Sequence, residues 1–450
     1  MKSVFVVGAG PAGLYATQKL ARAGHSVFLF NRDIKTGGLA EYGIYPTKEK
    51  MKGGLRKLFG RILDMPNVAY FGHSTVASGK AFTIDLLREW NPDALVFAVG
   101  AQGTKKIGLP GEDSSGVYSA KDFVYNYNLL PPFTSQDFST GKRIAVIGMG
   151  NVMVDLAHWL LVDDPNHTTE EVTVIARRGP FEAKFDRREF DYIEEYLDCR
   201  ALEDELGRIK ERIAAVGQDT AKVAEASFPA LAKPRQDPTG AKLRFRFLSS
   251  PTAIHADSDG RINRLTVAEN DLIPRNGGTA SRTTDKTYDL EVDTLIFAIG
   301  DIVDPTVGLP STKGNFVTNP ETSQSEQAAY EVFDPQIAHV VKGTYVLGWA
   351  RKASEGVVGK ARFDAELGVD HILKYLEGVS EGSTPSAAEI RASLDRKGLQ
   401  PVTRNELAHL ARAEQKQASE RGVPSFKFGT DQDMLAAIEA EKSKSGNAAA

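Results

Sequence analysis

Short apolar runs that end in glycine recur along the chain, and the first of them opens a strand–loop–helix unit. Residues 3–8 predict a strand, and a glycine-rich loop at residues 8–13 follows it directly. Residues 14–23 then predict a helix that Gly24 ends, and residues 26–30 predict the next strand. This is the order of a βαβ unit, in which the two strands run parallel.

The same unit recurs near the middle of the chain. Residues 143–147 predict a strand, residues 148–153 form a second glycine-containing loop, and a helix is expected to about Val162 before a strand at residues 172–176. Two copies of one unit predict an α/β fold with two Rossmann-like domains, each built on a parallel sheet with right-handed crossovers.

Other segments have different patterns. Residues 94–100 and 294–300 are apolar runs closed by glycine, which favours buried strands that end at a nucleotide-binding edge. Residues 243–292 alternate in short runs and predict antiparallel ribbons. From about Gly378 the chain is rich in Ala, Glu, Lys, Arg and Ser, which predicts a C-terminal helical extension.

The first loop has the spacing of a dinucleotide-binding turn. Gly8 permits a tight turn, Gly10 lets a pyrophosphate approach the backbone, and Gly13 lets the helix pack closely on the strand. The acidic residue usual at the end of the second strand is Asn31, which can hydrogen-bond a ribose but without charge assistance, and Arg32 follows it. The alternative interpretation is a purely structural turn.

The second loop keeps two glycines, Gly148 and Gly150, and the strand after it ends in Arg177 and Arg178. Guanidinium groups at that position match the 2′-phosphate of an adenosine ribose, so the pair favours NADP(H) over NAD(H). A solvated basic loop is the alternative. Two dinucleotide units in one chain imply two nucleotides, normally a flavin and its hydride donor.

Composition narrows the class of protein. The 450 residues are 41% hydrophobic and 25% charged, as in ordinary globular proteins, and their net charge of −4 argues against a protein that mainly coats nucleic acid or a membrane. No apolar run reaches the ~18 residues of a membrane helix, so we expect a cytoplasmic protein.

The single cysteine, Cys199, excludes an intramolecular disulfide and a cysteine-ligated iron–sulfur cluster. The scattered histidines predict no metal site.

Further motifs follow one another in order along residues 8–16, 38–39, 42–44, 46, 97–101, 109–112, 119–123, 148–152, 155, 176–185, 247–251, 348–349 and 356–359. Their order and spacing resemble those of the adrenodoxin-reductase-like branch of ferredoxin–NADP(+) reductases, over residues 1 to about 376. The resemblance implies an FAD-dependent oxidoreductase that passes electrons between NADP(H) and a one-electron carrier, such as ferredoxin or a flavodoxin-like protein.

The resemblance also implies where the cofactors lie. FAD is expected on residues 1–105 and 325–376, NADP(H) on the inserted residues 106–324, and residues 377–450 form the helical extension. It assigns FAD binding to Gly8, Gly10, Pro11, Ala12, Gly13, Asn31, Arg32, Gly38, Leu39, Tyr42, Gly100, Gly348, Trp349, Gly356, Val357 and Val358. It assigns NADP(H) binding to Gly148, Gly150, Asn151, Val152, Arg177, Arg178 and Glu189. No catalytic acid or base is expected, because the cofactors carry the chemistry.

Three positions depart from the family pattern. Asn31 stands where an acid is usual, Lys48 where a histidine is usual, and Tyr192 where a glutamate is usual. Two other functions therefore stay open: an electron-input flavoprotein subunit for a partner synthase or a two-electron acceptor, and a nucleotide-binding regulatory module without turnover.

Two segments have no assigned role. Residues 48–61 carry six basic side chains and one acidic one, a local charge of +5, which indicates either solvated surface or a docking patch for an acidic carrier. The C-terminal extension is expected to be unnecessary for cofactor binding. It is either a solvated appendage or a clamp across a subunit or carrier interface.

Overall fold

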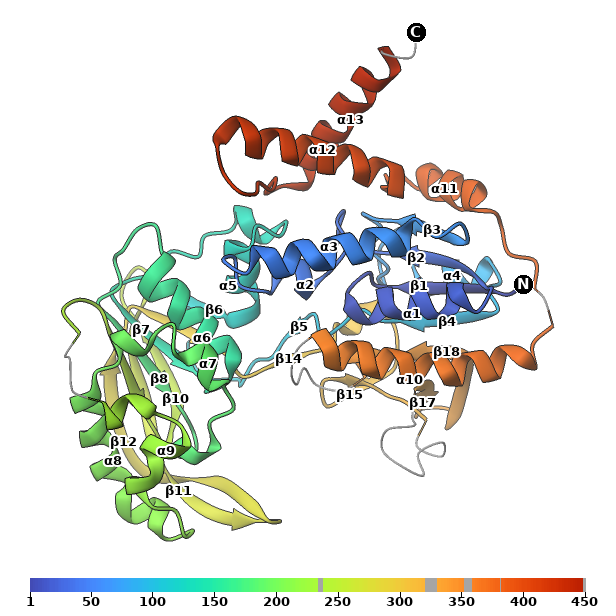
Figure 1. The fold of residues 1–450 in the computed structure, drawn as a ribbon. Helices are drawn as coiled ribbons and strands as arrows, with labels where there is room; N and C mark the ends of the chain where they lie inside the picture. Colours follow the sequence, from blue (N-terminus) through green and yellow to red (C-terminus); the bar gives the residue numbers. More distant parts are fainter. Residues whose placement is uncertain (234–237, 320–329, 352–357, 381, 448–450) are drawn as a thin grey trace. The chain divides into compact units, whose positions relative to one another are not determined.

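The computed structural model describes residues 1–233, 238–319, 330–351, 358–380 and 382–447 (Figure 1). The chain forms two compact units. The first unit comprises Met1–Thr104, Tyr125–Gln136 and Gly300–Ala450, and the second comprises Lys105–Val124 and Asp137–Ile299. The second unit is thus inserted into the first. Its limits differ from the expected residues 106–324, because residues 125–136 and 300–324 belong to the first unit.

The first unit is built on a six-stranded sheet in the order β17-β18-β4-β1-β2-β3. Its strands are β1 (Ser3–Val7), β2 (Ser26–Phe30), β3 (Val68–Phe71), β4 (Ala94–Phe97), β17 (Glu331–Asp334) and β18 (His339–Val346). All neighbours are parallel except β17, which pairs antiparallel with β18. The predicted β1–helix–β2 unit therefore lies at the centre of a Rossmann-like sheet.

The second unit repeats this plan. Its five-stranded sheet is parallel throughout, in the order β6-β13-β7-β8-β9. These strands are β6 (Val117–Ser119), β7 (Arg143–Ile147), β8 (Glu171–Ile175), β9 (Lys242–Arg246) and β13 (Thr294–Phe297). Two Rossmann-like units with C-terminal helices confirm the predicted fold class.

The antiparallel segment of the second unit begins later than expected. A separate three-stranded antiparallel sheet consists of β10 (Ser249–Ala256), β11 (Ile262–Arg275) and β12 (Gly278–Glu291). Residues 243–246, where alternation predicted a ribbon, instead pair in parallel with β8. The alternating pattern was misleading there because β9 is an edge strand of the parallel sheet, with one face buried and the other partly open.

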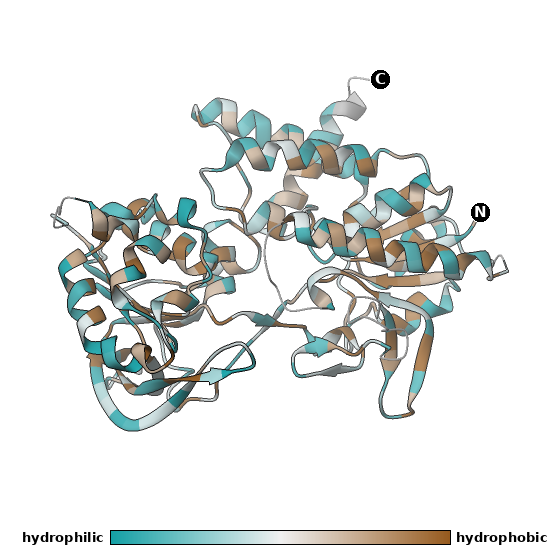
Figure 2. Cartoon of the chain, turned by 60° about the horizontal axis from the view of Figure 1, so that its bottom comes forward, coloured by the Kyte–Doolittle hydropathy of each residue, from teal (hydrophilic) through white to brown (hydrophobic). Residues whose placement is uncertain are grey.

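The helix after β1 is buried on most of its surface. Helix α1 (Pro11–Arg22) packs against α10 (Val358–Glu377), and Figure 2 shows hydrophobic and hydrophilic colours alternating along the helices. Helix α1 begins at Pro11 rather than at residue 14, because proline is favoured in the first helical turn, where no backbone donor is needed. Among the helices that the structure describes, none combines the length and the apolar character required to cross a bilayer.

The C-terminal extension belongs to the first unit and packs on its N-terminal part. It contains α11 (Ala387–Arg396), α12 (Arg404–Arg421) and α13 (Asp431–Asn447). Gly72 and Val402 exchange backbone hydrogen bonds of 2.8 and 2.9 Å at the end of β3. An apolar cluster then buries Ile34 against extension residues that include Val402, Leu410, Met434 and Ile438. A wholly solvated appendage is therefore the wrong interpretation.

A buried carboxylate ties the extension to the first unit. Glu41, in the short helix α2 (Leu39–Tyr42), is 2% exposed and accepts bonds of 2.7 and 2.9 Å from Arg56. The Lys427 ammonium lies 2.8 Å from the same carboxylate and Lys35 lies 3.8 Å away. Burial alone would raise the pKa of Glu41, but the charges of Lys35 and Lys427 and the hydrogen bond from Arg56 lower it to about 2.

We predict that Glu41→Gln lowers the free energy of unfolding at pH 7 by about 3 kcal/mol, because three cations lose their shared anion. The folded-state pKa lies below the unfolded one, so the stabilisation is complete above about pH 5 and is lost as the pH falls further. The difference between wild type and variant, measured by urea denaturation, should therefore shrink below about pH 5. Glu49→Gln, which removes a more exposed partner of Arg56, is the matched control and should cost less. Equal losses in the two variants would contradict a special role for Glu41.

Candidate functional site

The first glycine loop is held against the end of β4. Gly8 has φ +105°, and a Cβ there would lie 2.5 Å from the carbonyl oxygen of Ala98. A Cβ at Gly13 would lie 1.8 Å from the carbonyl oxygen of Gly8. A Cβ at Gly10, by contrast, would meet no described atom within 4 Å. The loop is therefore closed on the side of the sheet and open in front of α1.

The open side presents free backbone donors. Gly10 is the residue before α1 and no side chain caps the helix, which continues through Pro11 and Ala12. The first N–H groups of a helix carry a partial positive charge and bind phosphate when nothing else satisfies them. This part of the first unit fits the pyrophosphate of a dinucleotide.

Asn31, expected at the ribose, is used inside the protein. Its Oδ1 accepts a bond of 2.9 Å from the backbone N–H of Ala9, and its Nδ2 donates to the carbonyl oxygens of Asp33 and Lys35 at 2.9 and 3.0 Å. Both amide hydrogens are thereby engaged. The structure gives Asn31 a role in shaping the glycine loop, and its contact with a ribose stays a prediction.

A second segment, residues 37–42, approaches the same loop. Gly37 donates its N–H to the carbonyl oxygen of Ala9 at 2.7 Å, and a Cβ at Gly38 would lie 3.1 Å from the Cα of Gly10. Leu39 and Tyr42 begin and end α2 directly after this contact. The structure therefore brings the predicted FAD residues at 38–42 together with those at 8–13.

The third segment follows β18, the strand next to β4 in the sheet. Gly348, which follows β18, has φ +68°, and a Cβ there would lie 2.6 Å from the Cβ of Ala12. Trp349 is the next residue, and Val358 begins α10. Gly100, also predicted, follows β4 with φ +68°. The predicted residues Gly356 and Val357 lie outside the described residues.

The second unit has a glycine loop of the same form, closed on the side of the sheet and open in front of its helix. Gly148 has φ +121°, and a Cβ there would lie 2.3 Å from the carbonyl oxygen of Ala298. Around Gly150 the described atoms leave 4 Å free, and no side chain caps α6 (Asn151–His158). The Asn151 Oδ1 accepts from the N–H of Asp186 at 2.6 Å, and Val152 is 45% exposed. An anion can approach this loop as it can in the first unit.

The arginine pair follows β8 as predicted. Arg177 is exposed, whereas Arg178 is half-buried and its Nη1 lies 3.4 Å from the carbonyl oxygen of Thr279 in β12. The amide Nδ2 of Asn270, in β11, donates to the carbonyl oxygen of Arg177 at 3.0 Å. Two strands of the antiparallel sheet thus hold the basic loop in place.

Two other expected positions lie on this unit. Glu189 is half-buried in α7 (Arg187–Phe190). Tyr192, where the family has an acid, is 60% exposed, and its ring stacks on His158 with centroids 5.8 Å apart. Within the described residues, no group of His, Cys, Asp and Glu side chains is arranged to hold a metal ion.

Sequence reasoning missed the residues that the C-terminal extension brings to the first unit. The Nζ of Lys427 donates to the carbonyl oxygen of Glu41 at 3.1 Å and lies 5.0 Å from the ring centroid of Tyr42. Asp431 and Met434 line a cavity beside Asp33. No local pattern signals these contacts, because Lys427 is 386 residues from Glu41 along the chain.

The chain matches known proteins over most of its length. It is 29% identical over 418 residues to NADPH-ferredoxin reductase FprA of Mycobacterium tuberculosis, a match that covers 84% of this chain and 85% of that protein. It is 27% identical over 480 residues to the mitochondrial NADPH:adrenodoxin oxidoreductase of Arabidopsis thaliana, with 96% and 95% covered. These matches confirm the resemblance drawn from the motifs.

The solved structures agree. The structure of Mycobacterium tuberculosis FprA in complex with NADPH superposes with a TM-score of 0.81 at 26% identity, over 97% of this chain and 99% of that chain. Residues 2–227 match the profile of the family described as pyridine nucleotide-disulphide oxidoreductase. With both glycine-loop cradles in place, the chain belongs to the pyridine nucleotide-disulphide oxidoreductase family.

Proposed function

We propose that the chain is an FAD-dependent oxidoreductase that passes electrons between NADP(H) and a one-electron carrier of the ferredoxin type. One observation carries the proposal. Each unit presents an open glycine loop at the start of an uncapped helix. Only in the second unit is the strand after that helix followed by an arginine pair, Arg177 and Arg178. Two different nucleotides are therefore expected, one of them with a 2′-phosphate.

The first unit fits FAD. The pyrophosphate would lie before Gly10 and the N-terminus of α1, with Gly38 and Leu39 beside it. Gly348, which packs next to Ala12, would lie along the remaining length of the cofactor with Trp349 and Val358. The first unit is accordingly the FAD domain.

The second unit fits NADP(H). Gly150, Asn151 and Val152 would hold its pyrophosphate, and the exposed Arg177 and half-buried Arg178 would bind its 2′-phosphate. The two strands that fix the basic loop reduce the conformational entropy lost on binding.

The acceptor must be outside the chain. A flavin held by the first unit would supply the chemistry that converts hydride transfer from NADPH into single-electron transfer. The 450 residues contain one cysteine, so they cannot form the redox disulfide that the family name describes. Relatives named for ferredoxin and adrenodoxin point to a small redox protein as that acceptor.

Two measurements test this function. The purified protein should show flavin absorbance or bind added FAD, and stopped-flow mixing should show faster flavin reduction by NADPH than by NADH. Addition of ferredoxin- or flavodoxin-type carriers should then reoxidise the flavin. A protein that binds no flavin would overturn the proposal, and a protein that binds both nucleotides without NADPH-driven dye reduction would be a regulatory module instead.

We predict that replacing both Arg177 and Arg178 by Ala weakens NADPH use far more than NADH use. Two charge-assisted contacts to a phosphate, at about 1.5–3 kcal/mol each, shift the preference by more than about tenfold even when they are not additive. The ratio of kcat/KM for the two coenzymes measures this. Arg282→Ala, on an exposed residue of β12, is the control and should leave the ratio unchanged. Equal losses with both coenzymes would show a role in folding or general steering.

The basic segment at 48–61 divides into two groups. Lys52 is 2% exposed and donates to the Oδ1 of Asn128 at 2.9 Å, and burial lowers its pKa to about 7. Arg56 is engaged by Glu41 and Glu49. These two residues are structural, so the interpretation of the whole segment as a docking patch is wrong for them.

A smaller basic stripe remains on α3 (Glu49–Leu63). Lys50, Lys57 and Arg61 are exposed. They are spaced seven and four residues apart, which places them on one face of the helix. This stripe is the part of the segment that can attract an acidic carrier.

We predict that reversing Lys50, Lys57 and Arg61 to Glu slows reduction of an acidic carrier steeply at low ionic strength. Such a stripe acts mainly on the association rate, and salt screens it over about 8–10 Å. NADPH-driven dye reduction should hardly change. Reversal of the exposed Arg396, Lys397 and Lys416, which changes the net charge equally, is the control. If both triple variants behave alike, carrier docking involves another surface.

A further inference from the structure

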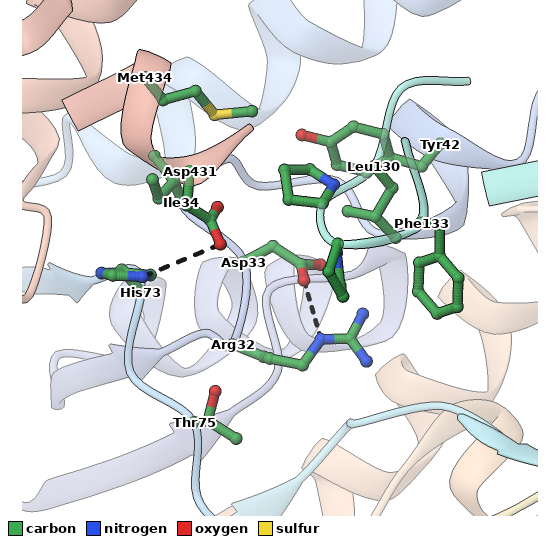
Figure 3. Close-up of a pocket in the computed structure, with 12 residues that line it drawn as sticks. Arg32, Asp33, Ile34, Tyr42, His73, Thr75, Leu130, Phe133, Asp431 and Met434 are labelled. Carbon is green, nitrogen blue, oxygen red and sulfur yellow. Dashed lines mark hydrogen bonds and ion pairs between the residues drawn. The ribbon is translucent and has the colours of Figure 1, made fainter. Parts of the chain in front are cut away.

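A cavity of about 270 Å³ opens beside the end of β2. Figure 3 shows Arg32 and Asp33 near its middle, with His73, Asp431 and Met434 on one side and Leu130 and Phe133 on the other. It is lined by Arg32, Asp33, Ile34, Tyr42, His73, Thr75, Leu130, Pro131, Pro132, Phe133, Asp431 and Met434. All these residues belong to the first unit.

One wall of the cavity comes from the C-terminal extension. Asp431 and Met434 lie in the first turn of α13, and Met434 is 1% exposed. Met434 packs in the apolar cluster with Ile34, and Lys427, four residues before α13, is bound to Glu41. The extension wall is therefore anchored on both sides of the cavity.

The position of the cavity matches one part of a dinucleotide. When the pyrophosphate lies at the N-terminus of α1, the adenosine lies at the end of the second strand of the unit. That strand is β2, and Arg32, Asp33 and Ile34 follow it within the cavity lining. The cavity is smaller than the roughly 300–1,000 Å³ of pockets that hold whole drug-sized ligands, so it fits a single moiety.

The lining has the polarity that an adenosine group requires. Leu130, Pro131, Pro132 and Phe133 on one side and Met434 on the other offer apolar surface for a flat base. Carboxylates accept hydrogen bonds from ribose hydroxyls and from the exocyclic amine of adenine.

Two carboxylates face the cavity, and they differ in their engagement. Asp33 pairs with the Nε of Arg32 at 2.8 Å, whereas the Oδ2 of Asp431 lies 4.0 Å from the Nε2 of His73. The pKa of Asp431 is raised chiefly by burial, which the charge of His73 opposes. The Asn31 amide already serves Ala9, Asp33 and Lys35, so the carboxylate acceptors that line this end of the first unit are those of Asp33 and Asp431.

We propose that the C-terminal extension completes the adenosine pocket of FAD, with Asp431 as a hydrogen-bond acceptor for the adenosine group. This inference rests on the proposed function. It replaces the expectation that the extension is unnecessary for cofactor binding, and it gives residues 400 positions away from the glycine loop a part in holding FAD.

The experiment compares ligands that contain or lack the adenosine group. Flavin-free protein is titrated with FAD, FMN and ADP, and binding is measured by flavin fluorescence and by calorimetry. Asp431→Leu removes the acceptor at similar size, and Asp431→Asn removes only the charge. Asp433→Asn is the matched control, because Asp433 is exposed in the same helical turn and keeps an oxygen for the hydroxyl of Thr430.

Asp431→Leu should weaken FAD and ADP binding by the same factor, about tenfold or more, with a smaller loss in Asp431→Asn. FMN binding should not change, and neither should any affinity in Asp433→Asn. Equal weakening of FAD and FMN would mean that Asp431 only supports the fold. An unchanged FAD affinity in Asp431→Leu would overturn the inference. If ADP also binds to the FAD-loaded wild type and Asp431→Leu abolishes that binding, the cavity belongs to a free nucleotide, which overturns the inference as well. Failure of wild type to bind FAD would instead refute the proposed function.

Discussion

Both cofactor cradles depend on a close backbone contact between a glycine and the neighbouring strand of the sheet. In the first unit the glycine after β1 lies against the carbonyl group of Ala98, and in the second the glycine after β7 lies against that of Ala298. Any Cβ at Gly8 or Gly148 would collide with that carbonyl oxygen and push the loop away from the sheet. Because the loop lies against the sheet, the helix after it begins with its N–H groups free and pointing at open space.

The two units share this geometry but differ in the residues that would meet a nucleotide. The difference lies in the residues at the end of the second strand: an internally bonded Asn31 in the first unit, and Arg177 with Arg178 in the second. A guanidinium pair at this position favours a ligand that carries an additional phosphate. On the proposed function, the same fold would hold a flavin in the first unit and a phosphorylated pyridine nucleotide in the second, and the route of electrons would follow from that asymmetry.

The C-terminal extension is held by charge as well as by apolar packing. Glu41 stays ionised although it is buried, because Arg56 and Lys427 surround its carboxylate. A buried ion pair of this kind is costly to break and so defines one arrangement of the partners. Here it joins α2, which follows the glycine contact at Gly38, to the segment that leads into α13. The flavin-side loop and the extension are consequently parts of one packed structure.

The sequence by itself determined the parallel sheets, both glycine loops and the arginine pair, because turn geometry and strand periodicity depend on neighbouring residues. It also indicated the family through the order of those motifs. Only the tertiary structure showed that Lys52 is buried and Arg56 is bound by two carboxylates, that Asn31 braces the loop, and that Asp431 lines a cavity beside Asp33. These roles come from contacts between residues far apart in the chain, and whether a charged side chain is free or engaged depends on which distant groups fold against it.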